Sequence, residues 1–111
     1  MKKIALPVVN DKFSSHFGHA SHFVIYSIEE DKIINEEKHP VPFHEPGSFP
    51  RWLSEFGVEI VLLGGVGQKA IEIFQENNID VIMGITKEKP QEVIQEYIKG
   101  TLASKANVCD H

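Results

Sequence analysis

The sequence predicts an α/β protein in which a five-stranded mixed sheet carries helices on both faces. In the second half of the chain, short apolar segments alternate with amphipathic ones, which is the pattern of parallel strands joined by helices. In the first half, apolar segments follow one another with only short polar turns between them, which indicates antiparallel strands. A length of 111 residues corresponds to one domain. We expect this domain over residues 1–100 and a flexible tail over 101–111.

The first half supplies three predicted strands. Residues 3–9 form an apolar strand in which Pro7 predicts a bulge or a strand end, because proline cannot donate to a ladder. A polar loop is expected over residues 10–20. Strands over residues 21–28 and 32–38 follow, joined by a tight turn, and the charges of the second of these are typical of an edge strand.

The first helix follows an irregular, proline-rich segment predicted over residues 39–46. Ser48 is the predicted N-cap, with Pro50 in the first turn. The spacing i, i+3, i+4, i+7 then gives a core-facing stripe. Its members are Phe49, Trp52, Leu53 and Phe56. Gly57 is expected to end this helix in a left-handed conformation.

The second half contains a βαβ unit and a last helix. We predict buried strands over residues 58–63 and 79–83, a helix over 67–77 between them, and a last helix between Pro90 and Gly100. Because such crossovers are right-handed, the two strands are parallel. With the first strand placed beside residues 58–63, the spatial order of the strands becomes 3-2-1-4-5.

Three histidines lie close together in and after the polar loop: His16, His19 and His22. Imidazole is a frequent metal ligand, and Gly18 allows the backbone to approach a bound group. His16 is the first candidate for a ligand and His19 the second, whereas His22 begins a strand and fits a surface position. The alternative is that these residues only shape the loop. His39 and His44 lie in the proline-rich segment, which could fold over the same site.

A second candidate loop is the turn formed by Gly64, Gly65 and Gly67. Ligands of open α/β sheets bind at the carboxyl ends of parallel strands, where we expect this turn and the histidine loop to meet. Its amides and the helix that follows favour negative charge. The alternative is that the glycines only allow a tight turn and close helix packing. Residues 65–70 also match the fingerprint of dinucleotide-binding loops. The match lies past the middle of the chain, where only one βαβ unit remains, and this argues against dinucleotide binding.

The chain ends in Cys109 and His111, which could hold a soft metal or belong to a mobile terminus. A single cysteine excludes an internal disulfide and fits a reducing, cytoplasmic location.

The net charge of −5 argues against nucleic acid as a partner. No apolar run approaches the roughly 18 residues of a membrane span, and the start of the chain does not fit a signal peptide. No set of residues suggests catalysis, so we expect a protein that is not an enzyme.

Several passages together resemble one family. They are IALPV near the start, HFGHA at residues 16–20, PRWL at residues 50–53 and GGVGQKAI at residues 64–71. On these, the chain resembles the dinitrogenase iron–molybdenum cofactor biosynthesis family, which includes NifX and the C-terminal part of NifB. The resemblance implies a ribonuclease H-like fold. It places the family's histidine at His16, its glycines at Gly18 and at the turn, and a terminal cysteine–histidine pair at Cys109 and His111.

The resemblance also implies a function. The nitrogen-fixing members of the family bind the iron–molybdenum cofactor or its iron–sulfur precursors and carry them between assembly proteins. We therefore expect this chain to carry such a cluster as a monomer or weak homodimer, with cluster-assembly proteins as partners. Nuclease activity is rejected, because strand 3–9 contains no acidic residue. The alternative function is a metal-free regulatory or interaction domain that binds a small anion or a protein.

Overall fold

A computed structural model describes residues 2–14, 20–42 and 48–100 of the chain. The elements are β1 (Lys2–Val9), β2 (Lys12–Phe13), β3 (His22–Glu29), β4 (Lys32–Pro40), α1 (Phe49–Glu55), β5 (Ile60–Leu62), α2 (Gln68–Glu76), β6 (Asp80–Ile82) and α3 (Pro90–Lys99). None of the helices in these ranges is long and apolar enough to cross a membrane.

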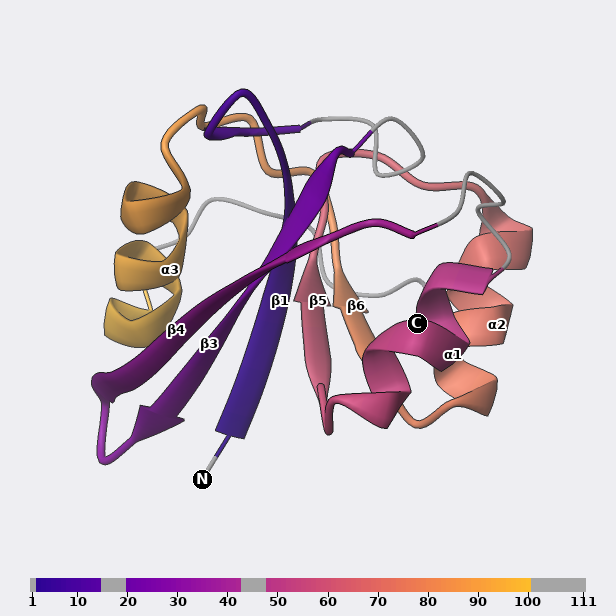
Figure 1. Ribbon diagram of the computed structural model, residues 1–111, viewed down its shortest axis with the longest axis horizontal. Coiled ribbons are helices and arrows are strands. Elements are labelled where there is room, and N and C mark those ends of the chain that lie inside the picture. The colour runs from indigo at the N-terminus through magenta and orange to yellow at the C-terminus, as the bar shows by residue number, and fades with distance from the viewer. Residues whose placement is uncertain (1, 15–19, 43–47, 101–111) are drawn as a thin grey trace.

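The strands form one mixed sheet in the order β4-β3-β1-β5-β6, with β2 paired to β1 (Figure 1). β1 is antiparallel to β3 and parallel to β5, and β5 is parallel to β6. The predicted order 3-2-1-4-5 is therefore confirmed for the five main strands. The sheet has a sixth strand, β2, in a part of the chain that was expected to be a loop.

β2 exists because the chain reverses tightly after β1. Asn10 and Asp11 have φ values of 53° and 63°, and both residue types tolerate this left-handed region. The turn aligns Val8 with Phe13 in an antiparallel pair. The predicted loop over residues 10–20 thus begins as a hairpin.

β1 continues through Pro7 without the predicted bulge or strand end, and Pro7 pairs with Phe23 of β3. The Pro7 carbonyl accepts a hydrogen bond from the Ser14 N–H at 2.9 Å. Because the N and C=O of one strand residue point to the same side, the Pro7 nitrogen also faces away from β3. The missing N–H therefore removes no bond from the β1–β3 ladder.

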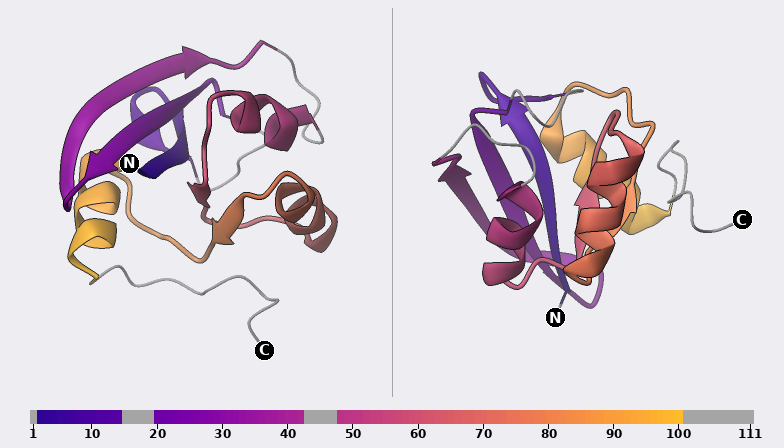
Figure 2. Two further views of the ribbon diagram at one scale, coloured as in Figure 1. Left: turned by 90° about the horizontal axis from the view of Figure 1, so that it is seen from below. Right: turned by 90° about the vertical axis from the view of Figure 1, so that its right-hand side faces the viewer.

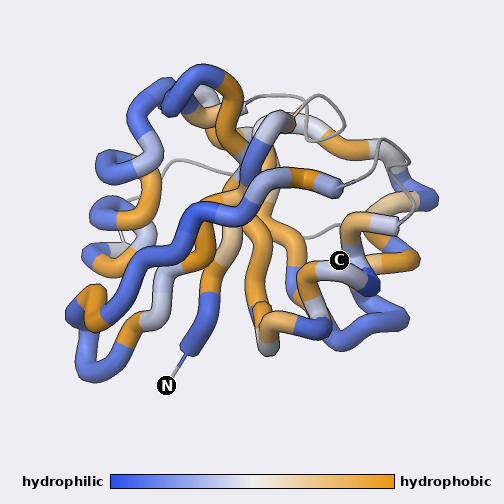
Figure 3. The backbone as a smooth tube through the Cα atoms, in the orientation of Figure 1, coloured by the Kyte–Doolittle hydropathy of each residue, from blue (hydrophilic) through white to orange (hydrophobic). Residues whose placement is uncertain are grey.

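β4 is longer than predicted and includes His39 and Pro40, which were expected in an irregular segment. His39 pairs with Phe23, and Pro40 pairs with His22. Since β4 is at the edge of the sheet order, proline is tolerated there. Figure 3 shows the hydrophilic character of this edge strand beside the hydrophobic strands of the sheet interior.

Helices cover both faces of the sheet, as predicted. α1 and α2 lie on one face and α3 on the other (Figure 2). Successive side chains of β1 alternate between these faces, so that Ala5 packs in the α1/α2 cluster while Ile4 and Leu6 pack in the α3 cluster. The α1/α2 cluster also holds Phe49, Leu53, Ile71 and Phe74, and the α3 cluster also holds Val24, Tyr26, Val93 and Ile94.

Most of the helix ends lie at the residues predicted from the sequence. Pro50 lies in the first turn of α1, although Ser48 at the N-cap position makes no side-chain capping bond. Gly57 after α1 and Gly100 after α3 have φ values of 80° and 76°. A side chain would be strained at these angles, which explains why glycine ends both helices.

Candidate functional site

The carboxyl ends of β1, β5 and β6 lie at one edge of the sheet. β1 aligns in parallel with β5 at Ile4 and Ile60, and β5 aligns in parallel with β6 at Ile60 and Asp80. The segments that follow these three strands therefore emerge at the same edge (Figure 1). This is where ligands bind in open α/β sheets.

The residues on both sides of the histidine segment, residues 15–19, are fixed at this edge. His16, Gly18 and His19 lie outside the described residues, but their neighbours in the chain do not. Before the segment, the Phe13 N–H donates to the Glu88 carbonyl at 2.7 Å, which ties β2 to the segment that follows β6. After it, the Ser21 N–H donates to the Val8 carbonyl at 3.0 Å. Both ends of the segment are thus fixed beside the last residues of β1.

The glycine turn follows β5 at the same edge. The Leu63 N–H donates to the Ile82 carbonyl, and the Gly84 N–H donates to the Gly64 carbonyl, each at 2.8 Å. These bonds extend the β5–β6 pairing to the start of the turn. Gly67 then occupies the N-cap of α2, with no side-chain capping bond and no acidic residue in the first helical turn. Amides in this position favour a negative charge.

Gly67 is not required by the fold around it. Its φ of −76° is available to any residue, and no described atom lies within 4 Å of a Cβ built at this position. Tight helix packing, the alternative explanation for these glycines, therefore does not account for Gly67. Its lack of a side chain leaves the start of α2 open.

One residue next to the histidine segment and one residue of the glycine turn pack in the same apolar cluster. Ala20, directly after the histidine segment, is buried in the α1/α2 cluster, and Val66 from the middle of the glycine turn packs against that cluster. Neither this link nor the attachment of β2 to the segment after β6 was predicted from the sequence. The turn-forming pair Asn10 and Asp11 was the signal that could have revealed the attachment.

The described histidines outside the segment have structural partners. Nδ1 of His22 lies 2.9 Å from the Ser21 hydroxyl. The ring of His39 packs on Phe56 with a centroid separation of 4.4 Å, and its Nε2 lies 2.8 Å from a Glu37 carboxylate oxygen. Hydrogen bonding to His39 lowers the pKa of Glu37. The interpretation of His39 as a ligand beside the glycine turn gains no support from these contacts.

The remaining candidates, His44, Cys109 and His111, lie outside the described residues. Within residues 2–14, 20–42 and 48–100, no group of three or more histidine, cysteine or acidic side chains is arranged to hold a metal ion. The described part of the site therefore offers backbone amides as binding groups. Its predicted metal ligands belong to segments that the structure does not describe.

The described part of the chain is thus a small α/β domain with one mixed sheet, in which the parallel strands β1, β5 and β6 end at a common edge. The model of the family described as dinitrogenase iron-molybdenum cofactor matches residues 1–100. The uncharacterised protein MJ0580 of Methanocaldococcus jannaschii is 32% identical over 107 residues, which cover 92% of this chain and 90% of that protein. The chain therefore belongs to the dinitrogenase iron-molybdenum cofactor family.

Solved structures share this fold. The crystal structure of PH0822 matches with a TM-score of 0.85 and 33% identity, over 98% of this chain and 99% of that one. The apo form of the orange protein from Desulfovibrio gigas matches with a TM-score of 0.75 and 20% identity, over 96% and 95% of the two chains. At that identity, the second match concerns the fold alone.

Proposed function

We propose that this protein binds an iron–sulfur or iron–molybdenum–sulfur cluster, or a precursor of one, as cargo and carries it without catalysing a reaction. In this proposal, His16 is the first ligand and His19 the second, and Gly18 lets the backbone approach the cluster. Cys109 and His111 add further ligands from the end of the chain. The amides of the turn at Gly64, Gly65 and Gly67 receive the anionic sulfides.

One observation supports the proposal most directly: the residues that flank the histidine segment and the glycine turn are held at the same edge of the sheet. Ala20 and Val66 join the same apolar cluster, and Ser21 is bonded to the end of β1. Imidazole nitrogen is a suitable ligand for iron. Backbone N–H groups that donate to cluster sulfurs stabilise the charge on the cluster.

The electrostatics of the α2 start also favour an anionic cargo. The first turn of α2 holds no acidic residue, and the exposed Lys69 adds a positive charge there. The overall net charge of −5 repels anions in general, so attraction must come from local groups. A site with few ligands releases its cargo readily, which suits transfer to cluster-assembly proteins.

The proposal is tested by anaerobic incubation with iron, sulfide and molybdate, followed by visible absorption and metal analysis after gel filtration. We expect the wild type to retain metal and sulfide and His16→Ala to lose most of both. His22→Ala is the matched control, because this histidine lies at the start of β3 with Ser21 as its neighbour. Unchanged uptake by His16→Ala would exclude the proposed ligand.

The glycine turn is tested by Gly67→Ser in the same assay. A side chain fits at this position without a clash, and serine is a preferred N-cap residue whose hydroxyl bonds a free amide of the first turn. The variant should fold at least as well as the wild type but retain less cluster. If the wild type takes up no metal and is instead stabilised by phosphate compounds, the metal-free alternative function is favoured.

A further inference from the structure

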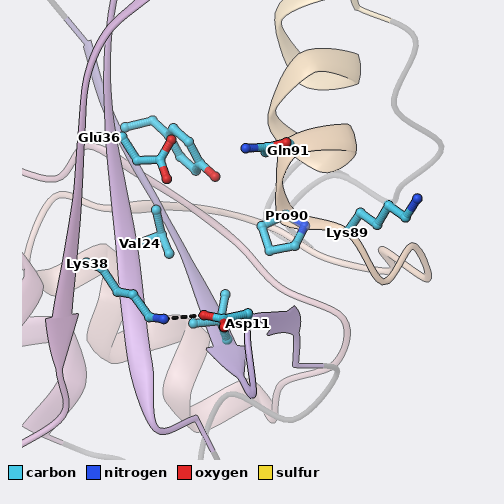
Figure 4. A pocket seen from close by; sticks show the side chains of 9 residues that line it. Asp11, Val24, Glu36, Lys38, Lys89, Pro90 and Gln91 are labelled. Atoms are coloured by element: carbon cyan, nitrogen blue, oxygen red, sulfur yellow. Dashed lines mark hydrogen bonds and ion pairs between the residues drawn. The ribbon is translucent and has the colours of Figure 1, made fainter.

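A cavity of about 310 Å³ lies on the α3 side of the sheet, between β3, β4 and the start of α3 (Figure 4). Its apolar base is formed by Val8 and Val24, which belong to the α3 cluster. Ala20 and Val66, at the proposed cargo site, belong to the cluster on the opposite face. The cavity is therefore separate from that site. Its volume is near the lower end of the range for small-molecule pockets.

Tyr26 lines this cavity and directs a hydroxyl group toward it. The residue as a whole is only 1% exposed, and none of the described residues forms a hydrogen bond with its hydroxyl. Since no buried polar side-chain atom of the described residues lacks a partner, the hydroxyl oxygen itself reaches the solvent in the cavity. Burial and the nearby Glu36 carboxylate raise the pKa of Tyr26 to about 12. The hydroxyl is therefore a protonated donor at neutral pH, and a ligand acceptor in the cavity could take its hydrogen bond in place of solvent.

Glu36 and Gln91 face the cavity from opposite walls. Glu36 comes from the edge strand β4 and Gln91 from the first turn of α3 (Figure 4). The neighbouring ammonium group of Lys38 is paired with Asp11, so its charge is already balanced. Within the described ranges, the Glu36 carboxylate has no ion-pair partner. The cavity thus presents a carboxylate acceptor beside a hydroxyl donor, above an apolar base.

We propose that this cavity binds a planar lactam heterocycle of the guanine type, presented as a nucleoside. The adjacent ring and amino N–H groups of guanine would both donate to the Glu36 carboxylate, which is a strong bidentate arrangement. The Tyr26 hydroxyl would donate to the neighbouring ring carbonyl, and Gln91 would bond the opposite edge. Adenine offers a single amino group and a ring nitrogen on the same edge, so it satisfies the carboxylate less well.

The test is a titration of guanosine into the full ¹⁵N-labelled chain, followed by amide chemical shifts. We expect saturable shifts at the amides of Tyr26 and Gln91 and none at Gly65, which belongs to the proposed cargo site. Adenosine should bind about tenfold more weakly, the factor that one well-placed hydrogen bond provides. Absence of saturable guanosine shifts at Tyr26 and Gln91 would overturn the proposal.

Two variants separate binding from folding. Glu36→Gln keeps the size of the side chain but removes its charge, and it should weaken guanosine binding by about tenfold or more. Tyr26→Phe removes a hydroxyl that makes no bond within the described structure, so it should fold normally and bind guanosine several-fold more weakly. Glu37→Gln is the matched control, because Glu37 contacts Asn35 and His39 and does not line the cavity. Equal affinities of Glu36→Gln and Glu37→Gln would also overturn the proposal.

Discussion

Gly57 and Gly67 are glycine for different structural reasons, and substitutions at the two positions can distinguish these reasons. Gly57 has a φ of 80°, whereas Gly67 has a φ of −76° and free space around its Cβ position. We expect Gly57→Ala to lower the free energy of unfolding by about 1 kcal/mol or more, because a side chain is strained in the left-handed region. Gly67→Ser should leave it unchanged or raise it. Denaturant titration of both variants checks this, and equal losses would contradict it.

The ion pair between Lys38 and Asp11 predicts a pH dependence. Hydrogen bonding to the Lys38 ammonium lowers the pKa of Asp11 below its ordinary 3.8. Since the folded pKa is the lower one, the pair stabilises the fold above pH 3.8 and its contribution is lost as the pH falls through the lowered value. Asp11→Asn should therefore be slightly less stable than the wild type at pH 7. The difference should vanish in acid, and one that grows in acid would refute this assignment.

At the scale of helices and strands, the periodicity of apolar residues predicted the features that depend on burial in the core. The apolar stripe of α1 and the strand order followed from the spacing of apolar residues, because each face of the sheet must be covered. The β2 hairpin and the extension of β4 to Pro40 were missed, because they depend on turn geometry and edge position. The predicted bulge or strand end at Pro7 was wrong. Proline disrupts a strand pairing only where its nitrogen faces the partner strand, and the sequence of a single strand does not tell which way this nitrogen points.

The hairpin between β3 and β4 offers an element-scale prediction. Its turn residues Glu30 and Asp31 have φ values of 53° and 64°, a geometry that asparagine followed by glycine adopts most readily. The double variant Glu30→Asn, Asp31→Gly should raise the free energy of unfolding by roughly 1 kcal/mol, because strain at both positions is relieved. Denaturant titration measures this. A loss of stability would show that the acidic side chains themselves support the turn.

For the whole molecule, the sheet separates two apolar clusters and, with them, two proposed binding sites. The common edge for the glycine turn and the residues that flank the histidine segment could be predicted, because parallel strands end together. The cavity at Tyr26 could not, since it depends on the packing of β3 and β4 against the start of α3. Which imidazoles meet a cluster remains a prediction, because His16 and His19 lie outside the described residues.

The two clusters share the strands of one sheet, so we expect the molecule to unfold as a unit. Ile94 is fully buried in the α3 cluster, and Trp52, the single tryptophan, packs against the α1/α2 cluster on the other face. Ile94→Ala should lower the free energy of unfolding by about 2–5 kcal/mol. Because the central strands contribute side chains to both clusters, Trp52 fluorescence and far-UV circular dichroism should shift to the same lower midpoint.

Leu53→Ala, in the α1/α2 cluster, is the matched control, and its two midpoints should also coincide. If Ile94→Ala shifted the dichroism midpoint but left the Trp52 midpoint in place, the α3 layer would be an independent unit, and cooperative coupling through the sheet would be wrong.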